Sequence, residues 1–312
     1  MAPWDSAIRF EASEDGKTYW AAIALDTIPV AGLEVDGFSS IEALESGATS
    51  QKVTVQKVGR IKGVILAHLI PCVCEIAQKS VTYHTIVLQL LAPTPNPDTP
   101  IYCIGLNYRN HAEEAKLTIP PCPPMWYKPA GALANHAEDI LFPTVAHTNF
   151  PDYEGELTVI LRGPTKSISN AEASSAILGY TIGNDLTARM FQDPKRCGGQ
   201  YTYAKAFDAF APLGPRLVHP SKFKPSAPNT IETRVNGKVV QQSTLDFIFP
   251  VMDLVSFLSQ GTTVPYGSAI MTGTPAGVGF FQKPQAQLSD GDVVEVEIQP
   301  IGVLKNKIVF EK

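Results

Sequence analysis

A proline-rich segment at residues 92–100 most constrains how this chain can fold. Its sequence, Ala-Pro-Thr-Pro-Asn-Pro-Asp-Thr-Pro, holds four prolines in nine residues. Proline lacks the backbone N–H that helices and inner strands require, and proline-rich stretches form extended spacers. We therefore expect a linker here, with a smaller N-terminal domain at residues 1–92 and a larger domain at residues 93–312.

The overall composition excludes several classes of protein. Hydrophobic residues make up 44% of the 312 residues, enough to build a core, so the chain is not mainly disordered. No stretch approaches the roughly 20 uncharged apolar residues that span a bilayer, so we expect no membrane partner. The formal net charge of −5 argues against a dedicated nucleic-acid binder. The 26 prolines and 23 glycines favour many turns and short strands.

The cysteines and the N-terminal sequence indicate an intracellular protein. The five cysteines are an odd number, and their spacing matches no zinc-binding pattern. The first residues contain neither the apolar segment of a secretory signal nor the basic composition of a transit peptide. We therefore expect reduced thiols in a cytoplasmic protein. The five are Cys72, Cys74, Cys103, Cys122 and Cys197.

Short apolar runs separated by turn residues predict a β-rich α+β fold rather than a doubly wound one. The strongest single signal is Asn236-Gly237, which fits a type I′ turn between strands at 230–235 and 238–241. A second hairpin is expected at 8–10 and 19–23. The other expected elements are strands at 101–105, 154–161, 177–182, 269–272 and 293–298, apolar runs at 64–74 and 87–91, helices at 40–45, 110–116 (capped by Asn110), 170–176 and 249–260, and a mobile loop at 193–202.

Two glutamates in the segment Asp152-Tyr153-Glu154-Gly155-Glu156 are candidate metal ligands. Side chains two residues apart on a strand point to the same face, so the carboxylates of Glu154 and Glu156 would lie together and repel each other. Either both face water at a sheet edge, or they share a cation. Because no Cys or His lies nearby, a shared ion would be a hard one such as Mg²⁺, Mn²⁺ or Ca²⁺.

Asp185 is a candidate third ligand. It follows an apolar run in the segment Gly183-Asn184-Asp185 and could equally cap a following helix. If residues 186–192 are helical, Arg189 and Gln192 follow at one and two turns and lie near the same site.

Three further groups could take part in chemistry. His111 and Glu114 share a helical face, either as an acid–base dyad or as an ordinary surface pair. Lys128 and Lys205 lie in apolar surroundings, either as snorkelling side chains or as binders of an anion or oxyanion. The glycine-rich segment 272–279 is either a small-anion loop or a structural turn, since it lacks the spacing of a nucleotide-binding motif.

Taken together, these segments resemble the fumarylacetoacetate hydrolase family. The similarity runs in order from about Leu90 to Val309, roughly two thirds of the chain. The matching segments are Leu-Leu-Ala-Pro (90–93), Ile-Gly-Leu-Asn-Tyr-x-x-His-x-x-Glu (104–114), Tyr-Lys-Pro (127–129), Tyr-Glu-Gly-Glu-Leu (153–157), Gly-Tyr-x-x-x-Asn-Asp-x-x-x-Arg-x-x-Gln (179–192), Lys-x-Phe-Asp-x-Phe-x-Pro-Leu-Gly-Pro (205–215), Val-Asn-Gly (235–237) and Thr-Gly-Thr-Pro-x-Gly-Val-Gly (272–279).

The resemblance implies a fold, an assembly and a metal site. Family members have a mixed β-roll or sandwich catalytic domain, here residues 93–312, a smaller N-terminal domain and usually a homodimeric assembly. Carried over by position, the metal ligands for Mg²⁺ or Mn²⁺ would be Glu154, Glu156 and Asp185. The catalytic residues would be Lys205, which stabilises an enolate or oxyanion, and the His111–Glu114 dyad on a lid. The substrate contacts would be Tyr108, Lys128, Arg189, Gln192 and Thr274.

The resemblance also implies a small anionic substrate, either a 2-oxo acid or a 1,3-dicarbonyl compound. Hydrolysis of a C–C bond in an acylpyruvate-like or fumarylacetoacetate-like substrate, through a metal-stabilised enolate, is the leading interpretation. Decarboxylation of an oxaloacetate-type acid and tautomerisation or isomerisation of an oxo acid would use the same site, and the motifs do not separate the three. A non-catalytic ligand-binding member and a nucleotide-binding enzyme are remote alternatives.

Two positions depart from the family pattern. Met190 stands where an acid commonly follows the arginine, and Asn110 stands where an aspartate commonly precedes the dyad histidine. Together with the aromatic residues Trp126 and Tyr127, Met190 motivates the hypothesis of a larger, apolar substrate.

Overall fold

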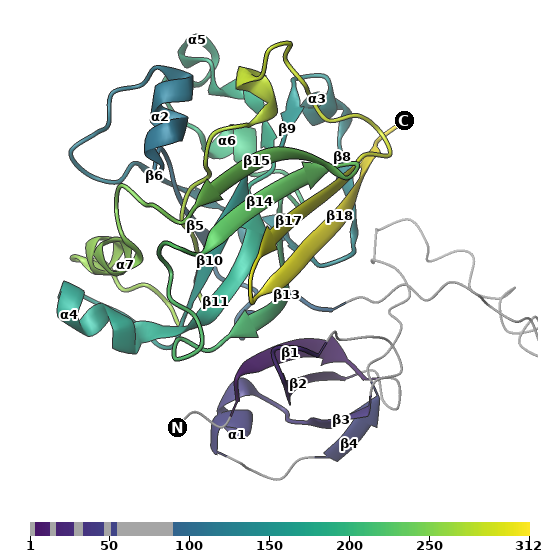
Figure 1. Ribbon diagram of the computed structural model, residues 1–312, viewed down its shortest axis with the longest axis vertical. Coiled ribbons are helices and arrows are strands. Elements are labelled where there is room, and N and C mark those ends of the chain that lie inside the picture. Colours follow the sequence, from purple (N-terminus) through teal and green to yellow (C-terminus); the bar gives the residue numbers. More distant parts are fainter. Residues whose placement is uncertain (1–3, 13–16, 28–33, 47–50, 55–89) are drawn as a thin grey trace, which may run out of the picture.

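The computed structural model describes residues 4–12, 17–27, 34–46, 51–54 and 90–312 (Figure 1). Two β-sheets form the body of the molecule, and short helices lie at its ends. The predicted β-rich α+β fold is confirmed by this arrangement. Within the described residues, no helix is both long and apolar enough to cross a membrane.

The larger sheet contains nine strands among the described residues. Its three central strands are buried along their whole length, because both faces of the sheet are covered. From one edge to the other, the strands are β2 (Thr18–Ile23), β1 (Ser6–Glu11), β13 (Ala211–Val218), β11 (Ile177–Asn184), β10 (Gly155–Leu161), β16 (Ala269–Met271), β5 (Ile101–Ile104) and β6 (Met125–Lys128), and β7 (Leu133–Asn135) pairs in parallel with β13.

The second sheet packs on the first and encloses the main core. Apolar side chains from both sheets meet there, among them Leu157 and Tyr180 from the larger sheet and Ile231 and Val296 from the smaller one. The predicted hairpin is confirmed, since Asn236 and Gly237 have φ angles of 52° and 78°, as a type I′ turn requires. The strands of this sheet are, in order, β15 (Lys238–Thr244), β14 (Thr230–Val235), β17 (Val293–Ile298), β18 (Gly302–Phe310) and β8 (Asp139–Phe142).

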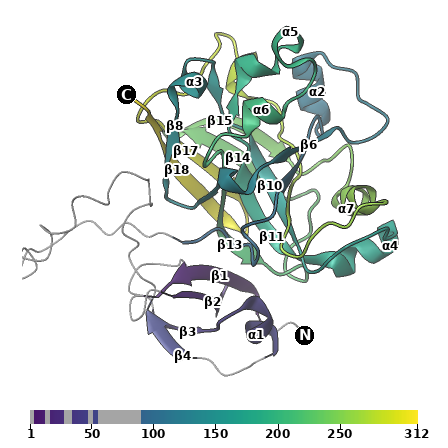
Figure 2. The same ribbon diagram turned by 180° about the vertical axis from the view of Figure 1, so that it is seen from behind.

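The helices are short, and several gather at one end of the body. Figures 1 and 2 show α2, α5 and α6 together at the end remote from the N-terminal elements. The α-helices are α1 (Ile41–Ser46), α2 (Arg109–Ala115), α3 (Thr144–His147), α4 (Asn170–Ala173), α5 (Pro194–Cys197), α6 (Thr202–Lys205) and α7 (Val251–Ser259). The 3-10 segments are η2 (Ala130–Ala132), η3 (Ser174–Ala176), η4 (Arg189–Gln192) and η5 (Gly279–Phe281). Two small strand pairs join β3 (Glu34–Gly37) to β4 (Gln51–Thr54) and β9 (Pro151–Asp152) to β12 (Thr187–Ala188).

The N-terminal elements are joined to the body by hydrogen bonds as well as by the chain. The predicted pairing of the first two strands is confirmed, and β1 continues the larger sheet through its register of Ser6 with Val218. The proline-rich segment 92–100 has no helix or strand, as expected, and Thr94 in it donates a 2.6 Å hydrogen bond to the carbonyl of Gly267. The domain division at residue 92 stays a prediction.

Most predicted helices and strands are present, with two corrections. Asn110 does not cap α2, because the cap position is Tyr108 and Asn110 lies inside the helix, where it bonds to Ser243. The predicted loop at 193–202 instead contains α5 and the start of α6, since the Asp193 side chain caps α5 through the N–H of Lys195. The predicted apolar run at 64–74 and the first residues of the run at 87–91 lie outside the described residues.

A glycine in the larger sheet provides a test of this packing. A Cβ at Gly179 in β11 would lie 2.6 Å from Leu217 Cγ and 2.8 Å from the carbonyl oxygen of Val218. We expect Gly179→Ala to lower the free energy of unfolding by about 1–3 kcal/mol through overpacking, measured by urea denaturation. Gly163→Ala is the matched control, because a Cβ there meets no atom within 4 Å. Equal losses in both variants would contradict the packing described here.

Candidate active site

Three buried carboxylates meet where β10 and β11 end. Glu154 directly precedes β10, Glu156 is its second residue, and Asp185 directly follows β11. The antiparallel register of the two strands sets Asp185 opposite Glu154, and the Asp185 N–H donates a 2.9 Å hydrogen bond to the Glu154 carbonyl. Ligand oxygens of all three residues lie within 4.8 Å of one another. The structure thus excludes the alternative in which the glutamates face water.

Lys205, the last residue of α6, places its ammonium group among these carboxylates. Its Nζ lies 2.8 Å from Glu154 Oε2, 2.7 Å from Asp185 Oδ2 and 2.9 Å from the Thr187 hydroxyl. Burial would lower the pKa of Lys205, but the Asp185 and Glu154 carboxylates outweigh it and raise that pKa. Lys205 is therefore a fixed cation among Glu154, Glu156 and Asp185, and we call this group of charged residues the floor of the site.

Glu156 is the carboxylate with the greatest need of a further positive charge. It accepts a 2.7 Å hydrogen bond from the Gly273 N–H. Burial, Asp185 and Glu154 all raise its pKa well above the usual value. Three buried carboxylates without Cys or His match the hard oxygen donors that Mg²⁺ and Mn²⁺ prefer. These residues therefore fit a divalent metal ion.

Lys128 lies beneath the cluster rather than on the surface of the site. Its side chain is fully buried, and Nζ lies 2.6 Å from Asp185 Oδ1. The same ammonium donates to the carbonyl oxygens of Leu186, Lys205 and Phe210 at 2.7–2.9 Å. These bonds leave it without access to a bound molecule, so its position does not match the predicted substrate contact. It holds Asp185 in place instead.

Arg189 forms a buried ion-pair network with Asp152, a residue to which the sequence analysis assigned no role. The guanidinium Nε and Nη2 atoms lie 3.0 and 2.9 Å from Asp152 Oδ2. Its Nη1 lies 2.6 Å from Glu154 Oε1 and donates to Gln192 Oε1 at 2.9 Å. The sequence did contain an indication for Asp152. It lies two residues before Glu154, and the same spacing made Glu156 a candidate.

His111 and Glu114 form the predicted contact on α2. His111 Nδ1 lies 3.1 Å from Glu114 Oε2, and the other oxygen of Glu114 accepts a 3.0 Å bond from the Gly277 N–H. Because Glu114 is held at both oxygens, it can fix the orientation of the imidazole. Tyr108, a predicted substrate contact, is buried and packs edge-on against Phe247 instead.

The glycine-rich segment 272–279 is a structural turn that binds the carboxylates of the site. The N–H groups of Gly273, Gly277 and Gly279 donate to side chains of this chain, at 2.7, 3.0 and 2.8 Å respectively. The acceptors are the carboxylates of Glu156, Glu114 and Asp152. Thr274 donates to the carbonyl of Gly155 and also lines the cavity described next. The small-anion interpretation of this segment is therefore not supported.

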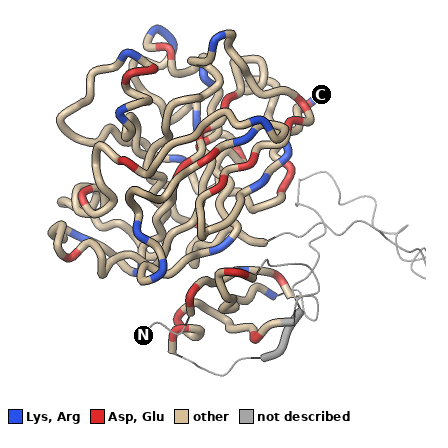
Figure 3. The backbone as a smooth tube through the Cα atoms, in the orientation of Figure 1, with Lys and Arg blue, Asp and Glu red and all other residues tan. Residues whose placement is uncertain are grey.

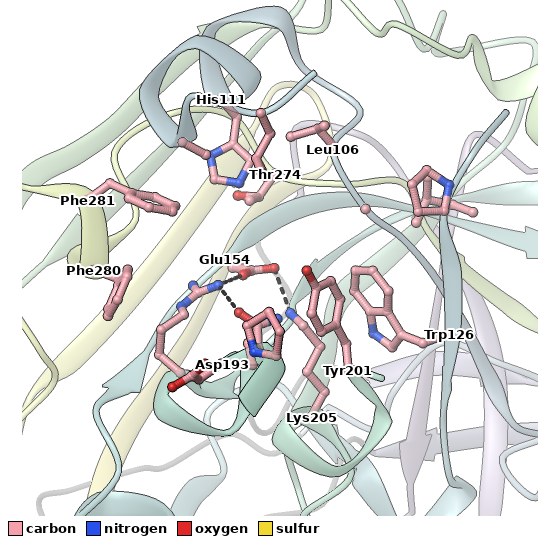
Figure 4. A pocket seen from close by; sticks show the side chains of 18 of the residues that line it. Leu106, His111, Trp126, Glu154, Asp193, Tyr201, Lys205, Thr274, Phe280 and Phe281 are labelled. Atoms are coloured by element: carbon pink, nitrogen blue, oxygen red, sulfur yellow. Dashed lines mark hydrogen bonds and ion pairs between the residues drawn. The ribbon is translucent and has the colours of Figure 1, made fainter. Parts of the chain in front are cut away.

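A cavity of about 590 Å³ lies above the carboxylates and is the place where a substrate would bind. Figure 4 shows Glu154 and Lys205 on one side and His111 and Thr274 across from them. In Figure 3, acidic and basic positions also occur on the central strands rather than only at the periphery. The predicted site residues on the cavity wall are His111, Glu154, Arg189, Gln192, Lys205 and Thr274.

Comparison with known proteins gives one consistent family. Residues 100–309 match the family model described as fumarylacetoacetate (FAA) hydrolase, C-terminal. Oxaloacetate tautomerase YisK of Bacillus subtilis is 39% identical over 232 residues, which cover 73% of this chain and 76% of that protein.

Two solved structures extend the similarity over nearly the whole chain. Fumarylacetoacetate hydrolase from Exiguobacterium antarcticum has a TM-score of 0.72 at 27% identity, covering 98% of this chain and 99% of that one. A 2-hydroxyhepta-2,4-diene-1,7-dioate isomerase from Mycobacterium marinum has a TM-score of 0.69 at 28% identity, covering 98% of each chain. The names of these three relatives include a tautomerase, a hydrolase and an isomerase.

The Asp152–Arg189 pair generates a stability prediction. Asp152→Asn removes one carboxylate from a buried guanidinium that is only 7% exposed, so we expect the free energy of unfolding to fall by about 3 kcal/mol. Chemical denaturation measures the change. Asp5→Asn is the control, because its pair with Lys222 is more than two-fifths exposed, and it should cost under about 1 kcal/mol. If Asp152→Asn were as stable as this control, the pair would not organise the site.

Proposed function

The chain belongs to the fumarylacetoacetate hydrolase family, and we propose that it is a divalent-metal-dependent tautomerase of a 2-oxo acid. One observation carries the proposal. His111, which Glu114 contacts, and Lys205 line one cavity above three buried carboxylates. Keto–enol exchange needs a base at C3 and positive charge at the 2-oxo oxygen, and these groups supply both. The relative named oxaloacetate tautomerase supports the same reaction.

The cation and the floor residues would act on the substrate carbonyl. A divalent ion held by Glu154, Glu156 and Asp185 would polarise the 2-oxo group as a Lewis acid. Lys205 adds a second positive charge beside the same carboxylates. Gln192 accepts from Arg189 through its oxygen, which leaves its amide N–H groups available to the substrate carboxylate.

His111 would move the proton. Since its Nδ1 contacts Glu114, Nε2 is the nitrogen that remains to accept a proton from C3 of the keto acid. The Glu114 carboxylate stabilises the imidazolium that forms, and the Gly277 N–H keeps that carboxylate in position. Transfer of a proton from the imidazolium to the enolate oxygen gives the enol and regenerates the base, so the isomerisation consumes no water.

Hydrolysis of a C–C bond is the second candidate, because the cavity has room for more than a small 2-oxo acid. The same dyad would then activate water for attack on a carbonyl of a 1,3-dicarbonyl substrate. NMR of oxaloacetate and of acylpyruvates, with and without Mg²⁺, separates the reactions. Tautomerisation leaves the carbon skeleton unchanged, hydrolysis yields two fragments, and decarboxylation yields CO₂. Homodimeric assembly and a cytoplasmic location remain proposals that accompany the family assignment.

Metal dependence is tested at Glu156, which in this structure is not paired with any of the site's cations. We expect chelation with EDTA to abolish turnover and Mg²⁺ or Mn²⁺ to restore it. Glu156→Gln removes one anionic ligand, so we expect the Mn²⁺ affinity measured by calorimetry to fall at least roughly tenfold, in line with losses seen around metal sites. Glu232→Gln, at a half-buried position of β14 outside the carboxylate cluster, should bind Mn²⁺ normally. Full turnover by the EDTA-treated protein would refute a metal mechanism.

The dyad is tested by replacing its base. His111→Asn keeps the size of a polar side chain but removes the proton acceptor, so we expect kcat to fall about 10²–10⁴-fold with Mn²⁺ affinity unchanged. His147→Asn is the control, since that ring stacks on Phe310 away from the cavity. Normal kcat in His111→Asn would show that another group transfers the proton.

A further inference from the structure

The permanent positive charge on the cavity wall, that of lysine and arginine side chains, is confined to one end. Among the described residues that line the cavity, the only lysine is Lys205 and the only arginine is Arg189. Both cations contact Glu154, one at 2.8 Å and the other at 2.6 Å. Both cations are also paired with carboxylates, so the floor becomes the favourable place for a substrate carboxylate and its neighbouring 2-oxo group when Glu154, Glu156 and Asp185 hold a divalent ion.

The rest of the wall is apolar and largely aromatic. In Figure 4, Trp126 and Tyr201 lie on one side of Glu154 and Lys205, and Phe280 and Phe281 lie on the other. The Trp126 and Tyr201 rings are in edge contact, with centroids 5.7 Å apart, and the two phenylalanine rings are 5.3 Å apart. Further apolar lining includes Leu106, Leu117, Pro120, Pro124 and Met190.

Leu117 shows that part of this apolar wall is open to solvent. Its side chain lines the cavity and is 54% exposed. It follows α2 directly, two residues beyond the end of the helix that carries His111. An apolar group of a bound molecule would remove the Leu117 surface from water, which is favourable in proportion to the area covered.

A second carboxylate on the substrate would be unfavourable at the apolar end of the cavity, around Leu117. It would lose water against aromatic and aliphatic side chains, without a lysine or arginine among the described lining residues. The wall therefore disfavours a dicarboxylic acid and favours a monocarboxylic one.

We infer that this site takes a monocarboxylic 2-oxo acid whose C3 carries an apolar aryl or branched alkyl group. The carboxylate and 2-oxo group lie at the charged floor, and the apolar group lies among Leu117 and the aromatic side chains. The inference rests on the proposed tautomerase function and names its substrate class. It distinguishes this chain from a relative whose name specifies oxaloacetate, a dicarboxylic acid.

The test compares phenylpyruvate with oxaloacetate. The full chain is assayed with Mg²⁺ for enol-to-keto conversion of each acid, after subtraction of the uncatalysed rate in buffer. We expect kcat/KM to be at least about tenfold higher for phenylpyruvate, within the range by which an apolar pocket discriminates. Equal values, or a preference for oxaloacetate, would overturn the inference and leave the tautomerase function standing.

A charge placed on the apolar wall gives an independent readout. Leu117→Lys supplies a cation at an exposed position, so we expect the ratio of kcat/KM for phenylpyruvate over oxaloacetate to fall about tenfold. Ile119→Lys is the matched control, because Ile119 lies on the same segment, is 38% exposed and does not line the cavity. An unchanged ratio in Leu117→Lys, or the same change in both variants, would contradict the inference.

Calorimetry separates a failed inference from a failed function. If neither acid is tautomerised, the proposed function is wrong, and the affinities of the two acids for the Mg²⁺-loaded protein then decide the inference. Tighter binding of phenylpyruvate, weakened by Leu117→Lys and not by Ile119→Lys, would support it. Equal or tighter binding of oxaloacetate would overturn it.

Discussion

The structure depends on the burial of carboxylates and ammonium groups at one point of its core. Glu154, Glu156 and Asp185 are at most 5% exposed, and Lys128 and Lys205 are at most 1% exposed. Separating a charge from water costs several kcal/mol unless a partner and hydrogen bonds replace the solvent. The surrounding elements supply ion-pair partners for Glu154, Asp185, Lys128 and Lys205, whereas Glu156, within the described part of the chain, accepts only the Gly273 N–H.

The neighbours come from segments far apart in the sequence, which ties the fold to the site. The Lys128 ammonium collects three carbonyl oxygens and a carboxylate, and the N–H groups of the 273–279 turn bind three carboxylates. Asp152 joins that turn to Arg189. Loss of any one of these groups leaves a buried charge with fewer partners, so the same contacts that shape the site also stabilise the chain.

Local sequence patterns predicted many of the elements and side-chain pairs, but they did not predict contacts between residues far apart in the sequence. The Asn236-Gly237 turn, most strands and the pairing of His111 with Glu114 depend on residues close in sequence, and all are present. The meeting of Glu154 and Asp185 depends on strand register. The residues alone left Asp185 as either a ligand or a helix cap, and the family resemblance supplied its assignment as a ligand. Lys128 was interpreted wrongly because its sequence neighbours do not reveal that the carbonyl of Phe210 lies 2.7 Å away.

The floor of the cavity is built by the ends of strands, and part of the apolar wall is built by connecting segments. The carboxylates of the floor lie at the ends of the buried strands β10 and β11, which hold them in place. Leu117 and Phe281 instead lie on connecting segments outside the two sheets. Substitutions there change no buried charge, because the ion pairs of the floor lie elsewhere. Under the proposed function, substitutions on these connecting segments would change the substrate group that is accepted and leave the buried carboxylates in place.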